Sequence, residues 1–160
     1  MMLVIRKAEA KDVPMMLQFV RELAEYERNP SAVVATEEDL LRDGFGPSPK
    51  YFCLVAEWSS EPAGFAFYFH TYSTWLGRWG LYLEDLFVRP SFRGRGVGKA
   101  LLVELAKIGV EEKIGRMNWQ VLDWNTPAIE FYERLGALRL SEWETFRLAG
   151  EALERLARDG

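Results

Sequence analysis

Cysteine and histidine are almost absent from the sequence, which contains one of each, Cys53 and His70. A single cysteine cannot form a disulfide within the chain, and one cysteine with one histidine cannot supply the ligands of a zinc site. We therefore expect no bound metal. Cys53 lies in an apolar run, so we expect a small buried side chain there rather than a nucleophile. We assign no catalytic role to His70.

Long apolar runs and a basic excess are absent too. No stretch reaches the roughly 18 uninterrupted apolar residues of a membrane span, and the first residues, MMLVIRKAEAKD, lack the apolar core and cleavage site of a secretory signal. We expect a cytoplasmic protein with no membrane partner. Lys and Arg number 20 against 24 Asp and Glu, a formal net charge of -4. That balance disfavours nucleic-acid binding and makes a cationic small molecule easier to attract.

Apolar side chains are plentiful: 49% of the 160 residues are hydrophobic and 14% are aromatic. That length and composition suit one domain with a sizeable core. The sequence has no internal repeat, low-complexity tract or interdomain linker. We expect a single domain over residues 1–160.

Apolar periodicity predicts strands and helices in mixed order. Strands are expected at residues 3–6, 51–57, 64–72, 81–88 and 117–122, with a final pair at 138–141 and 145–148. Helices are expected at residues 13–26 after an N-cap at Asp12, at 36–44 after a capping box of Thr36 and Asp39, and at 98–110, 128–135 and 151–157. The spacer at residues 58–63 suits an antiparallel hairpin. This order predicts an α+β fold with one central sheet.

A glycine-rich loop, Arg93-Gly94-Arg95-Gly96-Val97-Gly98, lies between a predicted strand and a predicted helix. Glycine allows tight turns, and the first amides of a helix lack internal partners and carry the positive end of its dipole, so a phosphate fits there. The spacing matches neither a Walker loop nor a dinucleotide fingerprint. What remains is R-x-x-G-x-G, which a plain helix-start loop would also satisfy.

The sequence around this loop resembles the GCN5-related N-acetyltransferases. The segment YLEDLFVRP (residues 82–90) precedes the loop, and NTPAIEFYERLG (residues 125–136) follows it. The resemblance covers essentially the whole chain and is strongest to the diamine (spermidine/spermine) and thialysine acetyltransferases. That closer likeness rests on LAEYE (residues 23–27), residues 36–46, CLVAE (residues 53–57), residues 81–88 and Trp124-Asn125.

The resemblance implies an acyltransferase fold with a splayed, mostly antiparallel central sheet flanked by helices, and acetyl-CoA as the co-substrate. The pantetheine arm would pair with the backbone of Leu86, Phe87 and Val88. An extended, amide-bearing arm satisfies strand hydrogen-bonding groups, and the diphosphate belongs at the helix start. The other implied cofactor-binding residues are Arg93, Gly94, Arg95, Gly96, Val97, Gly98, Lys99, Asn125, Thr126, Pro127, Ala128 and Tyr132.

Acetylating a primary amine requires a base, because a group with a pKa of about 10.4 is almost wholly protonated at neutral pH. Glu84 is the candidate base, directly or through water; a solvent-facing strand carboxylate is the alternative. Tyr132 is the candidate acid that protonates the departing thiolate, as the resemblance also implies; a core aromatic is the alternative. Backbone amides near Leu86 are placed to polarise the thioester carbonyl.

Polyamines carry several ammonium groups, so their site should hold several carboxylates. The resemblance implies an acceptor site formed by Tyr26, Glu27, Glu84, Asp85, Asn118, Trp119, Gln120 and Glu144. One departure stands out: the diamine enzymes typically carry an acidic residue where this chain has Ser73, which puts spermidine or spermine in doubt. Trp75, Trp79 and Trp124 either shape the pocket through cation–π contacts or are core or interface residues.

These observations predict an acetyl-CoA-dependent N-acetyltransferase that acts on a small amine, of the diamine, polyamine or thialysine type, by direct attack in a ternary complex. Acetylation of a protein or peptide amine is the alternative reaction. A non-catalytic CoA-binding sensor is the alternative outside catalysis. The resemblance also implies a homodimer.

Overall fold

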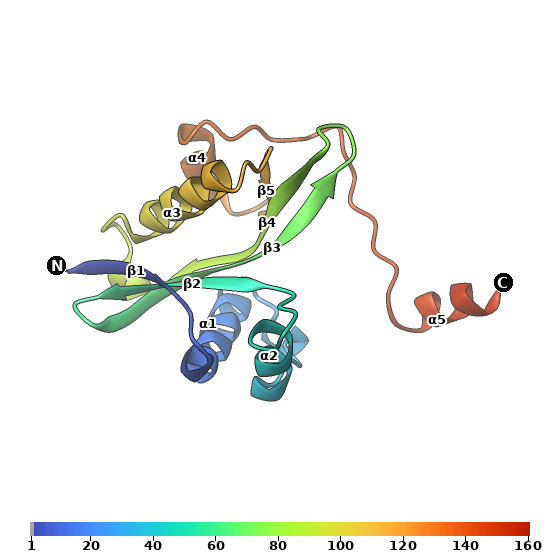
Figure 1. Ribbon diagram of the computed structural model, residues 1–160, viewed down its shortest axis with the longest axis horizontal. Helices are drawn as coiled ribbons and strands as arrows, with labels where there is room; N and C mark the ends of the chain where they lie inside the picture. Colours follow the sequence, from blue (N-terminus) through green and yellow to red (C-terminus); the bar gives the residue numbers. More distant parts are fainter. Residues whose placement is uncertain (1) are drawn as a thin grey trace. The chain divides into compact units, whose positions relative to one another are not determined.

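The computed structural model describes residues 2–160 and assigns them to alternating strands and helices (Figure 1). The strands are β1 (Leu3–Lys7), β2 (Phe52–Trp58), β3 (Glu61–Ser73), β4 (Arg78–Val88) and β5 (Met117–Trp119). The α-helices are α1 (Val13–Tyr26), α2 (Glu37–Gly44), α3 (Val97–Glu111), α4 (Thr126–Arg134) and α5 (Gly150–Arg158). Single turns of 3-10 helix lie at Ala10–Asp12, Pro30–Ala32 and Pro90–Phe92. The chain divides into two compact units, the first ending at Gln120 and the second beginning at Val121.

The first unit is built on a five-stranded sheet in the order β1-β2-β3-β4-β5. Neighbouring strands are antiparallel except for β4 and β5, which run parallel. The predicted hairpin joins β2 to β3, and Ser59 and Ser60 at its tip both have positive φ, at 50° and 69°. Two successive positive φ values match the right-handed twist of the flanking strands. The mostly antiparallel central sheet expected from the sequence is therefore confirmed.

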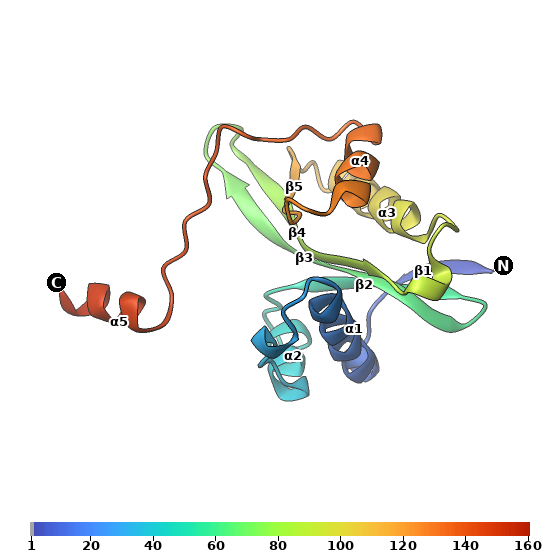
Figure 2. The ribbon, with the colours of Figure 1, turned by 180° about the vertical axis from the view of Figure 1, so that it is seen from behind.

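Helices cover both faces of this sheet, with α1 and α2 on one side and α3 on the other (Figures 1 and 2). On the α1 side, Phe19 packs on Phe65 with ring centroids 5.2 Å apart, among buried residues that include Met16 and Val55. Strand residues on the opposite face, such as Leu54 and Leu81, are buried with Leu101 of α3. Burying each such side chain stabilises the fold by roughly 1.5–3 kcal/mol.

Of the two helix starts predicted from N-cap residues, the start of α2 has the predicted hydrogen bonds and the start of α1 does not. The capping box at α2 is present: Asp39 N donates to Thr36 Oγ1 (3.2 Å), and Thr36 N donates to the Asp39 carboxylate (2.9 Å). Asp12 stands at the N-cap of α1 but makes no cap bond with its side chain. Its carboxylate instead accepts from Arg6 and from the backbone N–H of Glu9, so Asp12 fastens the helix entry to β1.

The second unit contains α4 and α5, joined by a segment without regular structure. Gly136, with φ of 95°, follows the end of α4 as predicted. The predicted strand pair at 138–141 and 145–148 is wrong, because the described chain has no strand between α4 and α5. Leu138 and Phe146 are 86% and 94% exposed, so the alternating apolar residues have no neighbouring strand in this unit. Across residues 2–160, every helix is too short or too polar to cross a lipid bilayer.

Candidate active site

The glycine loop forms the N-terminal end of α3. Gly94 and Gly96 have φ values of 76° and 80°, which L side chains rarely adopt, and a Cβ on either would meet nothing within 4 Å. Glycine is therefore required by the backbone conformation rather than by crowding. Gly96 is the N-cap of α3 and makes no side-chain cap bond. Because Ala100 N is bonded to Gly96 O, the three preceding amides have no intrahelical acceptor, which suits an anion.

Two arginines of this loop lie on aromatic rings. Arg95 lies over Trp58 at 5.1 Å and over Phe92 at 5.7 Å from the ring centroids. Arg93 lies over Tyr26 at 5.0 Å and over Phe87 at 5.7 Å. Both arginine residues are exposed. The loop thus presents two cations beside the open amides, an arrangement that favours a ligand with several phosphates.

The edge of β4 beside this loop is open. On one side β4 pairs with β3 along its length, from Arg78 to Val88. On the other side the parallel strand β5 pairs only with Leu81, Tyr82 and Leu83, and within the described chain no strand continues past them. The backbone at Leu86, Phe87 and Val88 therefore has free strand positions on the β5 side. An extended ligand with amide groups fits such an edge.

A β-bulge sets the position of Glu84. Phe67 pairs with Asp85 and Tyr68 pairs with Leu83, so Glu84 is an extra residue on β4. Bulges bend a strand and re-aim its side chains, and they are frequent next to active sites. Glu84 is exposed as a result, at the point where β4 ceases to pair with β5. No local sequence pattern indicates this bulge.

Three carboxylates share the neighbourhood of the bulge. Burial, with smaller contributions from the charges of Glu84 and Glu27, raises the pKa of Asp85 to about 7. Burial also raises the pKa of Glu27, and burial together with the charge of Glu84 raises the pKa of Tyr82. Asp85 therefore carries only part of its negative charge at neutral pH, and an approaching cation would increase that charge. An ammonium group suits this cluster.

The remaining predicted acceptor residues fall in both units. Tyr26 ends α1 and Glu27 follows it as the C-cap. Asn118 and Trp119 lie on β5, opposite Tyr82 and Leu83, and Gln120 follows directly. Glu144 lies in the second unit and is exposed. Within the first unit, Glu27 at the end of α1 contributes to the raised pKa of Asp85 on β4, and β5 pairs with β4 just before the bulge.

The second unit holds the remaining cofactor candidates and the candidate acid. Asn125 is the N-cap of α4, and Thr126, Pro127 and Ala128 form its first turn. Tyr132 lies one turn further along α4, with its ring centroid 5.5 Å from that of Phe131. Every residue of α4 is at least partly exposed.

Ser73 has a structural part in the β3–β4 hairpin. Ser73 is only 4% exposed, and its Oγ accepts hydrogen bonds from Leu76 N and Arg116 Nη2, both at 3.1 Å. The position where the diamine enzymes typically carry an acidic residue is thus occupied here by a buried hydroxyl with two donors. Trp75 and Trp79 nearby are 87% and 58% exposed, so they are not core residues.

The surroundings of Cys53 and His70 give each side chain a structural role. Cys53 is buried, as predicted, and burial raises the pKa of its thiol far above the neutral range, which disfavours the thiolate that a nucleophile needs. His70 lies 3.4 Å from a carboxylate oxygen of Glu112 and contacts the rings of Phe52 and Trp79. Within residues 2–160, no group of three His, Cys, Asp or Glu side chains is arranged to hold a metal ion.

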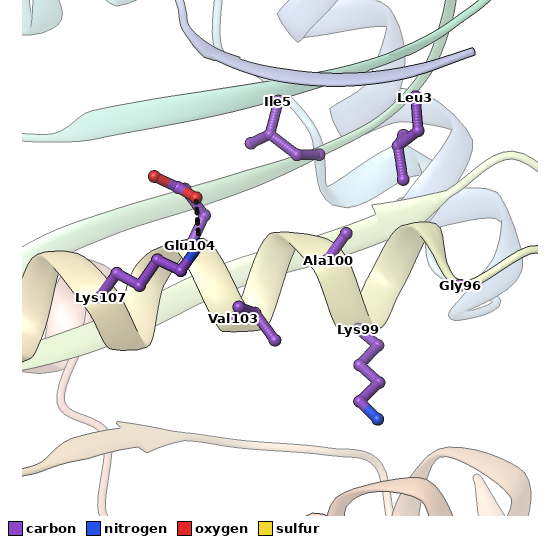
Figure 3. Close-up of a pocket in the computed structure, with 8 residues that line it drawn as sticks. All are labelled: Leu3, Ile5, Gly96, Lys99, Ala100, Val103, Glu104 and Lys107. Carbon is purple, nitrogen blue, oxygen red and sulfur yellow. Dashed lines mark ion pairs between the residues drawn. The ribbon is translucent and has the colours of Figure 1, made fainter. Parts of the chain in front are cut away.

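Two features of the first unit have no local signal in the sequence. Arg89 forms an ion pair with Glu22 of α1 (2.9 Å) and lies over the ring of Phe19, a pairing across 67 residues that no local pattern reveals. A groove of about 380 Å³ also lies between β1 and α3 (Figure 3). Its lining includes Leu3, Ile5 and Val103, and an ion pair joins Lys107 to Glu104 (3.9 Å). None of the acceptor candidates lines it.

Comparison with known proteins agrees with this geometry. The acetyltransferase (GNAT) family matches residues 15–137. The thialysine N-epsilon-acetyltransferase of Bos taurus is 42% identical over 164 residues, covering 96% of each chain. The spermidine/spermine N(1)-acetyltransferase-like protein 1 of Homo sapiens is 39% identical, covering 96% of this chain and 23% of that protein.

Among solved structures, an integron cassette protein from the mobile metagenome of V. cholerae has the same fold, with a TM-score of 0.81, 27% identity and 99% of both chains covered. The free amides at the start of α3 and the open β4 edge fit a diphosphate and an amide-bearing arm, as in acetyl-CoA. The chain therefore belongs to the GNAT family of N-acetyltransferases, which take acetyl-CoA as co-substrate.

Proposed function

We propose that this enzyme transfers the acetyl group of acetyl-CoA to the primary amine of a small molecule of the thialysine or polyamine class. The observation that carries the proposal is the carboxylate cluster of Glu27, Glu84 and Asp85 at the β4 bulge, beside the open strand edge. A cationic amine is the ligand that such a cluster attracts. The names of the similar enzymes from Bos taurus and Homo sapiens support the same class.

The binding residues are proposed in two groups. The backbone of Leu86 to Val88 and the loop from Arg93 to Lys99 hold the pantetheine arm and the diphosphate, and residues 125–128 border the arm. Tyr26, Glu27, Asp85, Asn118, Trp119, Gln120 and Glu144 form the acceptor site. When bound, acetyl-CoA supplies an activated acetyl group as a thioester.

Glu84 is proposed to accept the proton that the ammonium form of the amine must lose, directly or through a water molecule. Supplying the free amine at neutral pH is worth about 4 kcal/mol, because the pKa of about 10.4 lies some three pH units above it. The nitrogen then attacks the acetyl carbonyl carbon, a C–N bond forms and the C–S bond breaks. Tyr132 donates its phenolic proton to the departing sulfur, whose basicity is similar to that of a phenol.

Ser73 favours the thialysine type of acceptor over spermine. A long polyamine brings further ammonium groups, each of which needs a carboxylate. At residue 73 this chain offers a buried hydroxyl that already accepts two hydrogen bonds. Arg116, one of its two donors, is itself a cation. We therefore expect higher kcat/KM for thialysine than for spermine.

A homodimer and a single functional domain complete the proposal. The family match spans the boundary between the two units, which supports one domain over residues 1–160. The exposed apolar side chains of the second unit, including Leu138, Trp143 and Phe146, support burial against a second copy. Light scattering at micromolar concentration tests this, and a monomer alone would contradict it. The cytoplasmic location stays a prediction from the sequence.

The decisive experiment measures thiol release from acetyl-CoA with putrescine, spermidine, lysine, thialysine and a lysine peptide as acceptors. We expect turnover with a small amine that falls in Glu84→Gln and Tyr132→Phe. Glu61→Gln and Tyr72→Phe are the matched controls, since both residues are exposed on β3 and lie outside the proposed site. Preference for the peptide would favour the protein-acetylating alternative. Coenzyme binding without turnover of any acceptor would favour a sensor.

A further inference from the structure

Two arginines that flank the Pro90–Phe92 turn both reach back to helix α1. Arg89 pairs with Glu22 and lies 4.8 Å from the centroid of Phe19. Arg93 lies 5.0 Å from the centroid of Tyr26. Because Phe19, Glu22 and Tyr26 are spaced three and four residues apart, they share one face of α1. The segment between β4 and the glycine loop is therefore held to α1 at two points.

The two contacts differ in kind. Arg89 is a structural clamp, since it is half-buried, has a carboxylate partner and donates to the Pro62 carbonyl oxygen (3.2 Å). Arg93 is exposed, and within residues 2–160 no carboxylate lies within ion-pair distance of it. Its Nε donates to the carbonyl oxygen of Val88 at 2.8 Å. That carbonyl belongs to the last residue of β4, at the end of the open edge.

The planar guanidinium of Arg93 can contact the aromatic rings and a phosphate at the same time. Its Cζ lies over the ring of Tyr26 at 5.0 Å and over the ring of Phe87 at 5.7 Å from the centroids, and its Nε is bonded to the backbone. The N–H groups on Nη1 and Nη2 point along the edge of the plane and make no hydrogen bond within the described residues. A guanidinium can stack through its face while donating from its edge to a phosphate. A lysine ammonium has no such face.

We propose that Arg93 is a positioning residue that couples the diphosphate site to the acceptor site through Tyr26. Fixing the glycine loop around a diphosphate fixes the Arg93 guanidinium, and this in turn restrains Tyr26 and the end of α1, where Glu27 begins the carboxylate cluster. This inference rests on the proposed function, because it takes the loop as the coenzyme site and the end of α1 as part of the acceptor site. By linkage, amine and coenzyme then strengthen each other's binding by the same factor.

Arg95 provides the matched control. It lies in the same loop, two residues further on, and it also stacks on two rings, but these belong to Trp58 and Phe92 rather than to α1. Arg95→Lys and Arg93→Lys each keep one positive charge and each remove a stacked guanidinium. Only Arg93→Lys removes a contact with the end of α1.

The first test follows hydrogen–deuterium exchange when CoA, which cannot be turned over, is added at saturation. In the wild-type enzyme and in Arg95→Lys, we expect CoA to slow exchange both in the loop, at residues 94–99, and at the end of α1, at residues 24–29. In Arg93→Lys, the loop should still be protected and the end of α1 should not respond. Protection of the loop without any change at residues 24–29 in the wild type overturns the coupling and leaves the proposed function standing. Equal protection of α1 in Arg93→Lys also overturns it. No protection of the loop at millimolar CoA overturns the coenzyme site and, with it, the coupling.

The second test is the KM for thialysine at saturating acetyl-CoA. We expect Arg93→Lys to raise this KM by roughly two- to fivefold, the factor that corresponds to an exposed cation–π contact, with kcat changed less than twofold. Tyr26→Leu should raise this KM too, whereas Tyr26→Phe, which keeps an aromatic ring, should have the wild-type KM. Adding Arg93→Lys to Tyr26→Leu should cause no further rise. Additive effects of the two substitutions would overturn the coupling. If the wild-type enzyme does not turn over thialysine, the exchange experiment decides.

Discussion

Replacing Asp85 by asparagine tests whether the carboxylates at the β4 bulge are as close and as shielded as the structure places them. The pKa of Asp85 rises from an ordinary 3.8 to about 7, first because of burial and then because of the charges of Glu84 and Glu27. In the unfolded chain the same carboxyl group has its ordinary pKa. As pH rises from about 4 to about 7, the unfolded state therefore releases a proton that the folded state retains, and the folded state loses stability.

The size of this effect follows from the shift. A rise from 3.8 to about 7 corresponds to a destabilisation of at most about 4 kcal/mol at alkaline pH. Asp85 is half-buried, and water screens part of its charge, so we expect about 2 kcal/mol. Asparagine keeps the shape of the side chain and removes the charge. Asp85→Asn should therefore be more stable than the wild-type enzyme at pH 8 by about 2 kcal/mol and nearly equal to it at pH 4.

Urea unfolding followed by tryptophan fluorescence, repeated at several pH values between 4 and 8, measures this difference. Asp159→Asn is the control for removing a carboxylate from an exposed position, since Asp159 lies at the end of α5. If Asp85→Asn lowers stability at pH 8, or if its effect is the same at every pH, the Asp85 carboxyl group is not shielded from water and placed near Glu84 and Glu27 as described. The reasoning for a cation site at the bulge would then fail.

Three further predictions follow from the sites described above. Tyr132→Phe should lower turnover by about 10²-fold or more, the range for a lost general acid, while the Kd for CoA changes less than twofold; unchanged turnover would remove Tyr132 from the mechanism. Gly96→Ala should weaken CoA binding measured by calorimetry, because holding an alanine in the left-handed backbone conformation costs roughly 1–2 kcal/mol. Gly109→Ala within α3 should stabilise the fold and leave the Kd for CoA unchanged. Equal effects of the two substitutions on this Kd would contradict the role of the loop. Ser73→Ala should lower the free energy of unfolding by about 0.5–1.5 kcal/mol, since it removes the acceptor of two part-buried hydrogen bonds whose donors, on the exposed residues Leu76 and Arg116, water can reach, and leave the KM for thialysine unchanged; a raised KM would place Ser73 in the acceptor site.

The order of strands and helices could be predicted where the signal is local. The capping box of Thr36 and Asp39, the two-residue tip at Ser59 and Ser60, and the glycine loop before α3 each depend on residues a few positions apart. Local hydrogen bonds and backbone dihedrals decide such features, so the sequence contains the necessary information.

Features that need a distant partner could not be predicted in this way. Leu138 and Leu140 alternate as strand residues do, but alternation indicates a tendency to form a strand and does not supply a neighbouring strand. The bulge at Glu84 depends on the register of β3 against β4, which local sequence does not fix. Asp12 matches the N-cap pattern, but its carboxylate accepts a hydrogen bond from Arg6 of β1, a contact that the cap pattern does not indicate.

The site shows the same division. Spacing and helix physics predict the glycine loop. Glu84 and Tyr132 are predicted from their places beside the expected thioester, and the resemblance also implies Tyr132. The raised pKa of Asp85 depends on burial and on Glu27, which lies 58 residues earlier in the chain, and no spacing rule brings the two together. The stacking of Arg93 on Tyr26 is equally non-local.

The central claim is that the amides at the start of α3 hold the diphosphate of the co-substrate while its arm lies along the open edge of β4. A crystal structure of the complex with CoA tests this most directly. We predict diphosphate oxygens within hydrogen-bonding distance of the backbone amides of Val97, Gly98 and Lys99, and arm amides paired with the backbone of residues 86–88. CoA bound in the groove between β1 and α3 (Figure 3), or anywhere that leaves the β4 edge bare, would contradict the account.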